Sequence, residues 1–239
     1  MLGGVGTTNR PRTLIFDVLG TLLDEDAGLL AAATELAGPE HAAAFASSWQ
    51  QAHAAALTNV RDGARPYVSY EALHAEAVGA AAAETGLPVT TAQGQAASRF
   101  GHHLEPFDDV VAGLDELARD HRLVGLTNAG TAQAFAMSGH AGLRWTTLVS
   151  SETVGAFKPD PRMYAHARTS LALDPGSCLF VAAHPWDLDA AAAHGFRTAY
   201  VDRSASTSTE MDAYGRRFDH AVAGVGGLAA ALAADLPTT

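Results

Sequence analysis

Three short strings in the sequence carry residue types that nucleophilic catalysis uses. Asp17 and Thr21 lie in DVLGT, Lys158 lies in FKPDP, and Asp187 lies in AAHPWD. A carboxylate can act as a nucleophile when a nearby ammonium keeps it ionised and offsets the negative charge that develops during the reaction. We therefore predict that Asp17 is the nucleophile of a catalytic group, with Thr21 beside it and Lys158 keeping it charged. Asp187 is predicted to activate water against the resulting ester.

A fourth string, LTNA, carries Thr127 and Asn128. Their hydroxyl and amide groups are predicted to orient the nucleophile or a substrate carboxylate through hydrogen bonds. Each string alone has a purely structural explanation, because Asp, Gly and Thr form turns, Lys-Pro-Asp-Pro starts helices and Thr-Asn caps them. The four strings occur in order, however, and each follows an apolar run and precedes a helical one. This conjunction favours a catalytic site.

The elements that must position these residues follow from the apolar pattern. RTLIFDV (12–18) is predicted as a buried strand that delivers Asp17 to its carboxyl end, where ligands bind in open α/β sheets. Ala-rich helical segments from 24 to 104, broken by Gly and Pro, predict a helical insertion. The α/β alternation resumes with an amphipathic stretch at 107–121 and a second buried strand, RLVGLTN (122–128).

Further elements complete an α/β fold, predicted as a parallel sheet covered by helices on both faces. The predicted strands are 146–149, 178–182 and 197–202, and the predicted helices are 130–139, 160–170, 187–195 and 225–234. We expect residues 1–10 to be a disordered leader. Residues 11–23 and 105–239 should form the core that contains the sheet, and residues 24–104 the insertion. The Ser/Thr run at 204–209 is predicted as a surface loop.

Composition and charge restrict the classes of partner. The 239 residues carry a formal net charge of −11 without a clustered Lys/Arg stripe, which argues against nucleic acid and against anionic membrane surfaces. No apolar run reaches the ~18 residues that span a bilayer, and the start lacks the pattern of a signal peptide, so we expect a soluble cytoplasmic protein. A small organic acid remains the expected partner, because a few focused donors can hold a carboxylate within an acidic protein. The single cysteine, Cys178, is predicted to pack in a buried strand, and the scattered histidines do not predict a metal site.

Together, the motifs FDVLGTLLDE, RPYVSYEALHAEA, LTNAG, FKPDPRMY and VAAHPWDLDAAAAHGFRTAYVDR resemble those of the haloacid dehalogenase superfamily, and within it most closely the type II 2-haloacid dehalogenases. The resemblance runs through nearly all of residues 12–203. It implies a Rossmann-like core with a helical cap over the active site, and it implies Asp17 as the nucleophile. It also implies that Tyr164 lies near the leaving halide and Asp17.

Two positions set this chain apart from the phosphatases of the superfamily. Those enzymes place a second Asp two residues after the nucleophile to protonate the leaving group, where this chain has Leu19. They also hold Mg²⁺ with an acidic pair, and aligning Asp187 with the second member puts Ala183 in place of the first. Dehalogenation needs neither group, because a halide leaves without a proton. The resemblance therefore implies a reaction without metal or cofactor, in which Asp17 attacks by SN2, halide leaves, and water near Asp187 and Lys158 hydrolyses the ester to a 2-hydroxy acid.

Other positions depart from the dehalogenase pattern. Well-characterised members carry, after a cap tryptophan, an Arg that helps to take the halide, whereas Trp49 here is followed by Gln50, a poorer anion partner. Those enzymes also have Ser and Asn where this chain has Ala182 and His184. His184 is interpreted either as a hydrogen-bonding or basic group, or as a neutral residue that braces the following turn. Arg65 either supplies the missing cation or is an exposed turn residue.

The predicted substrate-binding residues are Thr127, Asn128, Leu19, Trp49, Gln50, Tyr164, His184 and Trp186. Two other functions stay open at this point. One is a phosphatase with an altered metal site, and the other is a member that has lost hydrolysis and serves as a binding protein or a specialised biosynthetic enzyme. The apolar cap is compatible with a homodimer.

Overall fold

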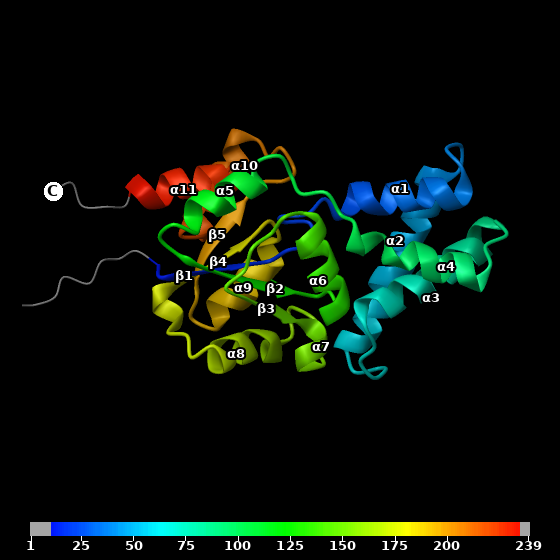
Figure 1. Cartoon of the computed structure of the whole chain (residues 1–239), viewed down its shortest axis with the longest axis horizontal. Helices are drawn as coiled ribbons and strands as arrows, with labels where there is room; N and C mark the ends of the chain where they lie inside the picture. Colours follow the sequence, from blue (N-terminus) through cyan, green and yellow to red (C-terminus); the bar gives the residue numbers. More distant parts are fainter. Residues whose placement is uncertain (1–10, 235–239) are drawn as a thin grey trace, which may run out of the picture.

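The computed structural model describes residues 11–234 of the 239-residue chain, so the predicted leader lies outside the described residues. Its core is a six-stranded sheet with the strand order β3-β2-β1-β4-β5-β6, in which every pairing is parallel (Figure 1). The strands are β1 (Thr13–Phe16), β2 (Arg122–Thr127), β3 (Thr147–Ser150), β4 (Cys178–Ala182), β5 (Arg197–Val201) and β6 (His220–Val222). Because the strands run parallel, their carboxyl ends meet at one edge of the sheet.

Strand β1 shows how an apolar run forms a central strand. Its four residues, TLIF, are all buried, and successive side chains enter opposite cores. Leu14 and Phe16 pack in one cluster and Ile15 in the other, which is the period of two that the pleated backbone imposes. Strand β4, CLFVA, is also buried throughout, with Cys178 at its start as predicted.

Helices cover both faces of the sheet, which confirms the predicted fold class. The cluster that contains Leu14 receives side chains from α5 (Val110–Leu117), α6 (Thr131–His140) and α11 (Val225–Ala234). The cluster that contains Ile15 receives side chains from α8 (Pro161–Ser170), α9 (Pro185–Ala193) and α10 (Ser208–Arg217). Two short elements, α7 (Ser151–Val154) and the 3₁₀ turn η2 (Pro175–Ser177), complete the core.

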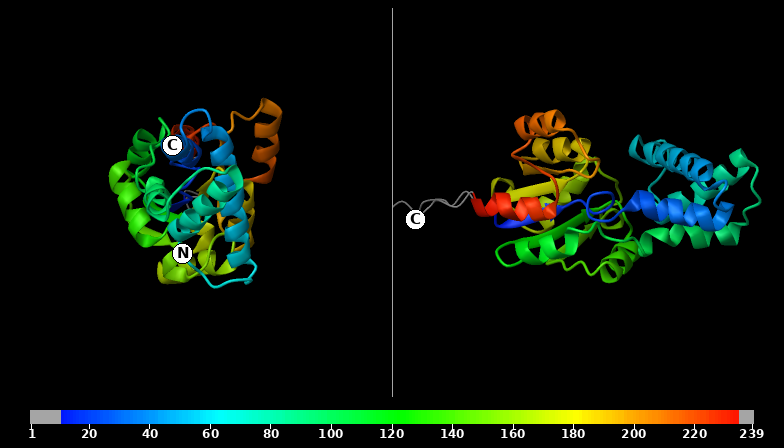
Figure 2. Two further views of the ribbon diagram at one scale, coloured as in Figure 1. Left: turned by 90° about the vertical axis from the view of Figure 1, so that its right-hand side faces the viewer. Right: turned by 90° about the horizontal axis from the view of Figure 1, so that it is seen from above.

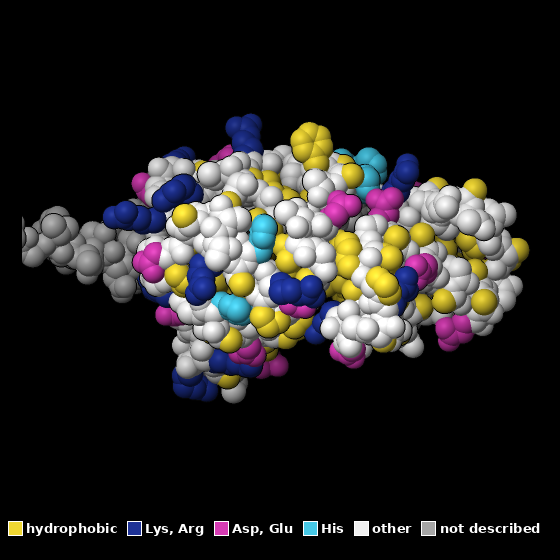
Figure 3. Space-filling model, turned by 90° about the horizontal axis from the view of Figure 1, so that it is seen from below, with side chains coloured by type: hydrophobic (Ala, Val, Ile, Leu, Met, Phe, Trp, Pro, Cys, Tyr) yellow, Lys and Arg dark blue, Asp and Glu magenta, His cyan; other side chains and the backbone are white. Residues whose placement is uncertain are grey.

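The insertion forms a helical cap beyond the carboxyl ends of the strands (Figure 2). It consists of α1 (Glu25–Ala37), α2 (Ala42–Arg61), α3 (Tyr70–Thr85), α4 (Thr91–Ala97) and the 3₁₀ helix η1 (Ser98–His102). The cap has an apolar core of its own around Phe45, Trp49 and Val78. On the face drawn in Figure 3, hydrophobic side chains gather over the cap, whereas Lys and Arg lie mostly on the core half.

Two linkers join the cap to the core, and they run side by side. The backbone N–H of Asp24 donates to the carbonyl of Glu105 (2.9 Å), and the N–H of Phe107 donates to the carbonyl of Leu22 (3.1 Å). The chain therefore enters and leaves the cap at one place, a few residues after Asp17.

The sequence does not predict two elements near the C-terminal end. Helix α10 begins at Ser208, inside the predicted loop 204–209, and Thr207 caps it in a capping box with Glu210. The loop prediction is wrong for its last two residues, because a Ser/Thr run also supplies helix caps. The three-residue strand β6 pairs with β5 at the edge of the sheet. Among the helices of residues 11–234, none has the length and apolar character to cross a bilayer.

Candidate active site

The turn after β1 places Asp17 at the floor of a cavity between core and cap. Gly20 in this turn has a φ of +71°, and a Cβ there would lie 3.0 Å from the ring of His184, so the turn requires glycine. Thr21 Oγ1 accepts the backbone N–H of Ala183 (2.9 Å), which directs its own hydroxyl proton to Asp17 Oδ2 (2.6 Å). The turn therefore supplies both the nucleophile and a donor that orients it.

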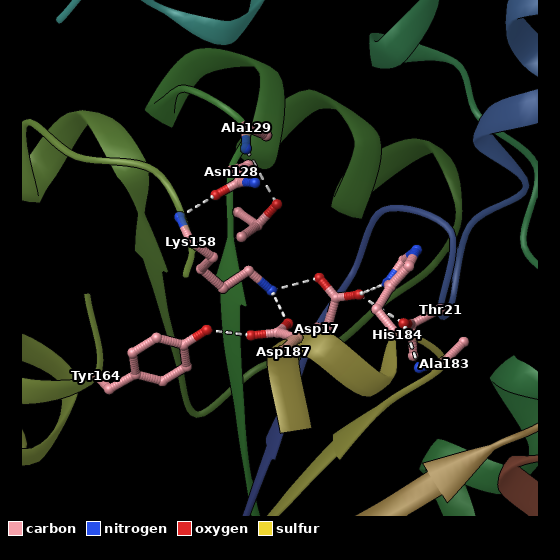
Figure 4. A network of polar contacts seen from close by, with 10 residues as sticks. Asp17, Thr21, Asn128, Ala129, Lys158, Tyr164, Ala183, His184 and Asp187 are labelled. Carbon is pink, nitrogen blue, oxygen red and sulfur yellow. Dashed lines mark hydrogen bonds and ion pairs between the residues drawn. The ribbon is translucent and has the colours of Figure 1, made fainter. Parts of the chain in front are cut away.

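Lys158 lies between two carboxylates at the centre of the site (Figure 4). Its Nζ is 2.5 Å from Asp17 Oδ1 and 2.5 Å from Asp187 Oδ2. The side chains of Lys158, Asp17 and Asp187 are only 1%, 5% and 0% exposed. An ammonium buried this deeply is tolerated because both carboxylates accept its hydrogen bonds. The structure thus brings together the three charged residues that the sequence predicts to act as one group.

The pKa directions follow from these contacts. Burial alone would raise the pKa of Asp17, but the charge of Lys158 and the hydrogen bond from His184 outweigh burial and hold this pKa well below its usual range. Burial opposes the charge on Lys158, yet the two carboxylates raise its pKa. For Asp187 burial prevails over Lys158, and the pKa is raised. Asp17 is therefore ionised at neutral pH.

Hydrogen bonds at the end of β2 hold the loop that carries Lys158. Asn128 Oδ1 accepts the backbone N–H of Lys158 (2.7 Å), and Ser151 Oγ donates to the backbone carbonyl of Asn128 (2.6 Å). The cap reaches the same point through the hydroxyl of Tyr67, which is 2.9 Å from Ser151 Oγ. Because its side-chain oxygen Oδ1 already accepts the N–H of Lys158, Asn128 offers the N–H groups of its side-chain amide to the cavity that it lines.

Asp187 is enclosed and does not line the cavity. One of its oxygens accepts the ammonium of Lys158, and the other accepts the hydroxyl of the fully buried Tyr164. Figure 4 shows Tyr164 on the side of Asp187 that faces away from Asp17. Asp187 and Tyr164 therefore hold Lys158 in place, and this geometry favours a different residue for contact with water.

His184 is a second titratable neighbour of Asp17 that lines the cavity. Its Nδ1 is 3.0 Å from Asp17 Oδ2, and its side chain is 36% exposed. Burial disfavours the cationic ring, but the hydrogen bond and the charge of Asp17 raise the pKa of His184. The ring of Trp186 lies 5.4 Å away and also lines the cavity. Esterification of Asp17 removes the charge that raises the pKa of His184, so the imidazolium releases its proton more readily, and the neutral ring can then act as a base.

The cavity has a volume of about 180 Å³. This is below the usual volume of sites for drug-sized ligands, about 300 Å³ and more, and suits a substrate of a few heavy atoms. The core contributes Asp17, Leu19, Asn128, Lys158, His184 and Trp186, and the cap contributes Glu25, Leu57, Arg61 and Tyr70.

The four cap residues are absent from the predicted site, although the sequence carries a signal for two of them. Leu57 and Arg61 continue an i, i+4 stripe of α2 that begins with Trp49 and His53. Trp49 and His53 are buried within the cap. The last two turns of the helix extend over the core, so the same stripe reaches the cavity there.

Four of the predicted substrate-binding residues do not line the cavity. Trp49 is fully buried in the cap, where its Nε1 donates to His74 Nδ1 (3.1 Å). Gln50 lies one position off the stripe, is exposed and donates to an aspartate of α1 (2.8 Å). Thr127 is fully buried, and its hydroxyl accepts the backbone N–H of Ala129 (3.1 Å), so it shapes the turn after β2. Tyr164, described above, is a fourth residue outside the cavity lining.

The cation that the cap brings to the cavity is Arg61. Arg65, the candidate considered from the sequence, forms a bidentate ion pair with Glu76 at 2.6 and 2.9 Å. Arg61 lines the cavity and is exposed, which places its guanidinium at the rim.

The donor set around Asp17 differs from that of a magnesium site. Lys158 Nζ fills the space between Asp17 and Asp187, and the position two residues after the nucleophile presents the apolar Leu19. Residues 11–234 contain no group of three or more His, Cys, Asp or Glu side chains that could hold a metal ion.

Comparisons with known proteins agree with this geometry. A family model of haloacid dehalogenase-like hydrolases matches residues 11–195. The (S)-2-haloacid dehalogenase of Pseudomonas sp. (strain YL) is 28% identical over 201 residues, which cover 83% of this chain and 85% of the relative. Among solved structures, the L-2-haloacid dehalogenase PA0810 is 33% identical with a TM-score of 0.83, over 94% of this chain and 99% of that one. The defluorinating L-2-haloacid dehalogenase Rha0230 is 28% identical with a TM-score of 0.83, over 93% of this chain and 95% of that one. Since the family model spans the whole cap and every residue of the charged network, the chain belongs to the haloacid dehalogenase-like hydrolases, as its motifs predict.

Proposed function

We propose that this hydrolase converts small (S)-2-haloacids to 2-hydroxy acids through a covalent ester on Asp17 and without a metal ion. The observation that carries the proposal is an ionised Asp17 at the floor of a cavity of about 180 Å³, with Lys158 Nζ 2.5 Å from it. The activities named for the relatives support this choice of substrate class.

Arg61 and Asn128 are the groups that would hold the substrate carboxylate. Arg61 brings a planar guanidinium to the rim, and the side-chain amide N–H groups of Asn128 donate no hydrogen bond within residues 11–234 and can donate to a ligand in the cavity. Leu19 and Leu57 offer apolar surface to the carbon chain. The carbon that bears the halogen would then lie over Asp17.

The first step is an SN2 displacement. A carboxylate oxygen of Asp17 bonds to C2 of the substrate while the carbon–halogen bond breaks and the halide leaves with its electron pair. Lys158 and Thr21 hold the nucleophile at 2.5 and 2.6 Å, so little reorganisation precedes attack. Halide leaves on the side opposite Asp17, toward the cap.

The second step is hydrolysis of the ester. Water attacks the carboxyl carbon of Asp17, and the oxyanion forms on the oxygen that is not bonded to substrate. Either oxygen of Asp17 can carry the oxyanion, because Lys158 donates to Oδ1 and Thr21 donates to Oδ2. His184, which lines the cavity beside Asp17, would accept the proton of the attacking water.

A single turnover in ¹⁸O water with 2-chloropropionate or chloroacetate tests the proposal. If the ester forms, mass spectrometry of digested protein finds ¹⁸O in the peptide that contains Asp17, and the hydroxy acid carries ¹⁶O. Direct attack of water on the substrate would place the label in the hydroxy acid instead and refute the covalent scheme. Asp17→Asn should release no halide, whereas Asp26→Asn, a change at an exposed position of α1, should behave as wild type.

The same preparation can be tested as a phosphatase. A panel of phosphate esters with and without Mg²⁺ should give no turnover, because Leu19 supplies no acid and Lys158 bridges the two carboxylates. Magnesium-dependent phosphate release would favour the alternative function. The cytoplasmic location and the homodimer stay predictions.

A further inference from the structure

One carboxyl in the cavity has no role in the scheme above. Glu25 is the first residue of α1, lines the cavity together with Asp17, and has a side chain that is 22% exposed. The hydroxyl of Tyr70, a residue only 7% exposed, donates to Glu25 Oε1 (2.9 Å). Within residues 11–234, no hydrogen bond is made to Glu25 Oε2.

The cap determines which oxygen of Glu25 is occupied. Trp49 Nε1 donates to His74 Nδ1 (3.1 Å), so this nitrogen carries no proton. Burial lowers the pKa of His74 to about 3, so the ring is neutral and its proton is on Nε2, 3.8 Å from Glu25 Oε1. His53 stacks on His74 with ring centroids 3.6 Å apart and holds the plane of the ring. Oε1 thus accepts the hydrogen bond of Tyr70 and has the Nε2–H of His74 near it at 3.8 Å, beyond hydrogen-bond distance, so a proton on Glu25 belongs on Oε2.

The charge balance of the cavity also favours a protonated Glu25. A second carboxylate beside Asp17 would repel an anionic substrate. Burial raises the pKa of Glu25, and the charge of Asp17 adds to this, while the hydrogen bond from Tyr70 and the interaction with His53 oppose it. The net direction is upward, so Glu25 keeps its proton to higher pH than a surface glutamate does.

Displacement geometry directs the leaving atom toward this carboxyl. Attack at a saturated carbon expels the leaving atom on the side opposite the nucleophile. Asp17 is on the core floor, so the leaving atom points to the cap wall, to which Glu25 and Tyr70 belong. Chloride and bromide leave without a proton, whereas fluoride is a stronger base and a stronger hydrogen-bond acceptor. A proton donor on the cap wall is therefore not needed for the departure of bromide, but it assists the departure of fluoride.

We propose that Glu25 is a catalytic acid that donates its Oε2 proton to the leaving atom, so that the substrates of this chain include 2-fluorocarboxylic acids. The inference rests on the proposed function. In the first step the Asp17 ester forms, the carbon–fluorine bond breaks, and the fluorine takes both the bonding electron pair and the proton of Glu25. In the second step water adds hydroxyl to the ester, the hydroxy acid leaves, and the proton of water returns to Glu25 by way of His184. The sum is fluoroacid plus water giving hydroxy acid plus hydrogen fluoride.

The experiment compares single-turnover release of fluoride and bromide from 2-fluoropropionate and 2-bromopropionate. In Glu25→Leu the ratio of the fluoride to the bromide rate constant should fall about 100-fold, the lower range for loss of a general acid. Glu25→Gln keeps an N–H donor without an acidic proton, so its ratio should lie between those of wild type and Glu25→Leu. In wild type, fluoride release should fall as pH rises through the pKa of Glu25, and bromide release should not. Asp26→Asn, in the same turn of α1 but outside the cavity lining, should leave the ratio unchanged.

Each other outcome has a definite meaning. Equal losses for both halides in Glu25→Leu would show that Glu25 only supports the cap, and would overturn the proposal. Bromide release without fluoride release from wild type would also overturn it, while the proposed function would stand. Release of neither halide would refute the proposed function itself. If Glu25→Leu instead raised KM selectively for 3-amino-2-chloropropionate, Glu25 would be an ammonium-binding carboxylate and not an acid.

Discussion

Replacing His184 by Ala should separate the two chemical steps. Asp17 would keep Lys158 at 2.5 Å and Thr21 at 2.6 Å and lose only the contact at 3.0 Å. A hydrogen bond to a charged group contributes about 1.5–3 kcal/mol; the lower value suits this partly exposed contact, so ester formation should slow by about tenfold. Loss of the base that accepts the proton of water should slow ester hydrolysis by about 100-fold or more. The ester should therefore accumulate.

Rapid-quench measurement of halide provides the assay. His184→Ala should release a burst of one halide per protein chain, followed by slow turnover, and the intact mass should increase by that of the bound acid residue. The pH profile adds a second readout. After esterification the charge that raises the pKa of His184 is gone, so kcat of wild type should rise with pH as the ring loses its proton, and kcat of the variant should be flat.

Two results would refute this reasoning on His184. One is a variant without a burst, in which kcat and kcat/KM fall by the same factor, because His184 would then act before or during ester formation. The other is an ester that hydrolyses at the wild-type rate, because water would then be activated elsewhere. His184→Asn gives a further comparison: an amide that still orients water should restore part of the hydrolysis rate.

Three further changes test the charged network and its supports. Lys158→Met should abolish halide release and lower the free energy of unfolding by about 3–5 kcal/mol at neutral pH in urea titrations. Without the ammonium the pKa values of Asp17 and Asp187 would rise, so the loss of stability should be larger at pH 8 than at pH 5. A loss of stability that does not depend on pH would contradict this assignment. Arg61→Leu should raise KM for 2-chloropropionate at least tenfold with a smaller change in kcat, while Gln50→Ala should change neither; the reverse pattern would favour the binding residues expected from the sequence. Arg203 donates to the backbone carbonyl of Thr21 at 2.8 Å, so Arg203→Leu should lower kcat by about tenfold, and Arg203→Lys should restore part of the lost kcat. An unchanged kcat in Arg203→Leu would mean that the turn after β1 holds its shape without this contact.

The core half of the site could be predicted because its geometry follows from the sheet. Asp17 and Asn128 come directly after buried strands that neighbour each other, and parallel strands place such positions at one edge. The roles of individual residues were harder to predict. Asp187 lies in the first turn of α9, five residues after the end of β4, and the hydroxyl of Tyr164 closes it off from the cavity. Only the packing of α8 against the sheet determines that contact.

The cap half could not be predicted from local pattern. Which turn of α2 reaches the cavity depends on how the helix lies over the core, and the prediction chose Trp49 and Gln50 where the structure uses Leu57 and Arg61. The i, i+4 stripe would have grouped three of these residues and set Gln50 apart. Glu25 was missed for a different reason: an acidic residue in the first turn of a helix usually stabilises the helix dipole, and nothing in its local sequence shows that it is half buried beside Asp17.

The paired linkers at Leu22–Asp24 and Glu105–Phe107 have a consequence for how such enzymes diversify. Because the backbone leaves the core and returns to it at neighbouring, hydrogen-bonded positions, the intervening segment resembles a long loop whose ends are already closed. Its length and sequence can change with little effect on the registers of the strands that carry Asp17, Asn128 and Lys158. The cap residues that line the cavity can therefore change in evolution independently of the core residues. Substrates with other leaving groups or other acid chains can then be accepted while the position of the nucleophile stays the same.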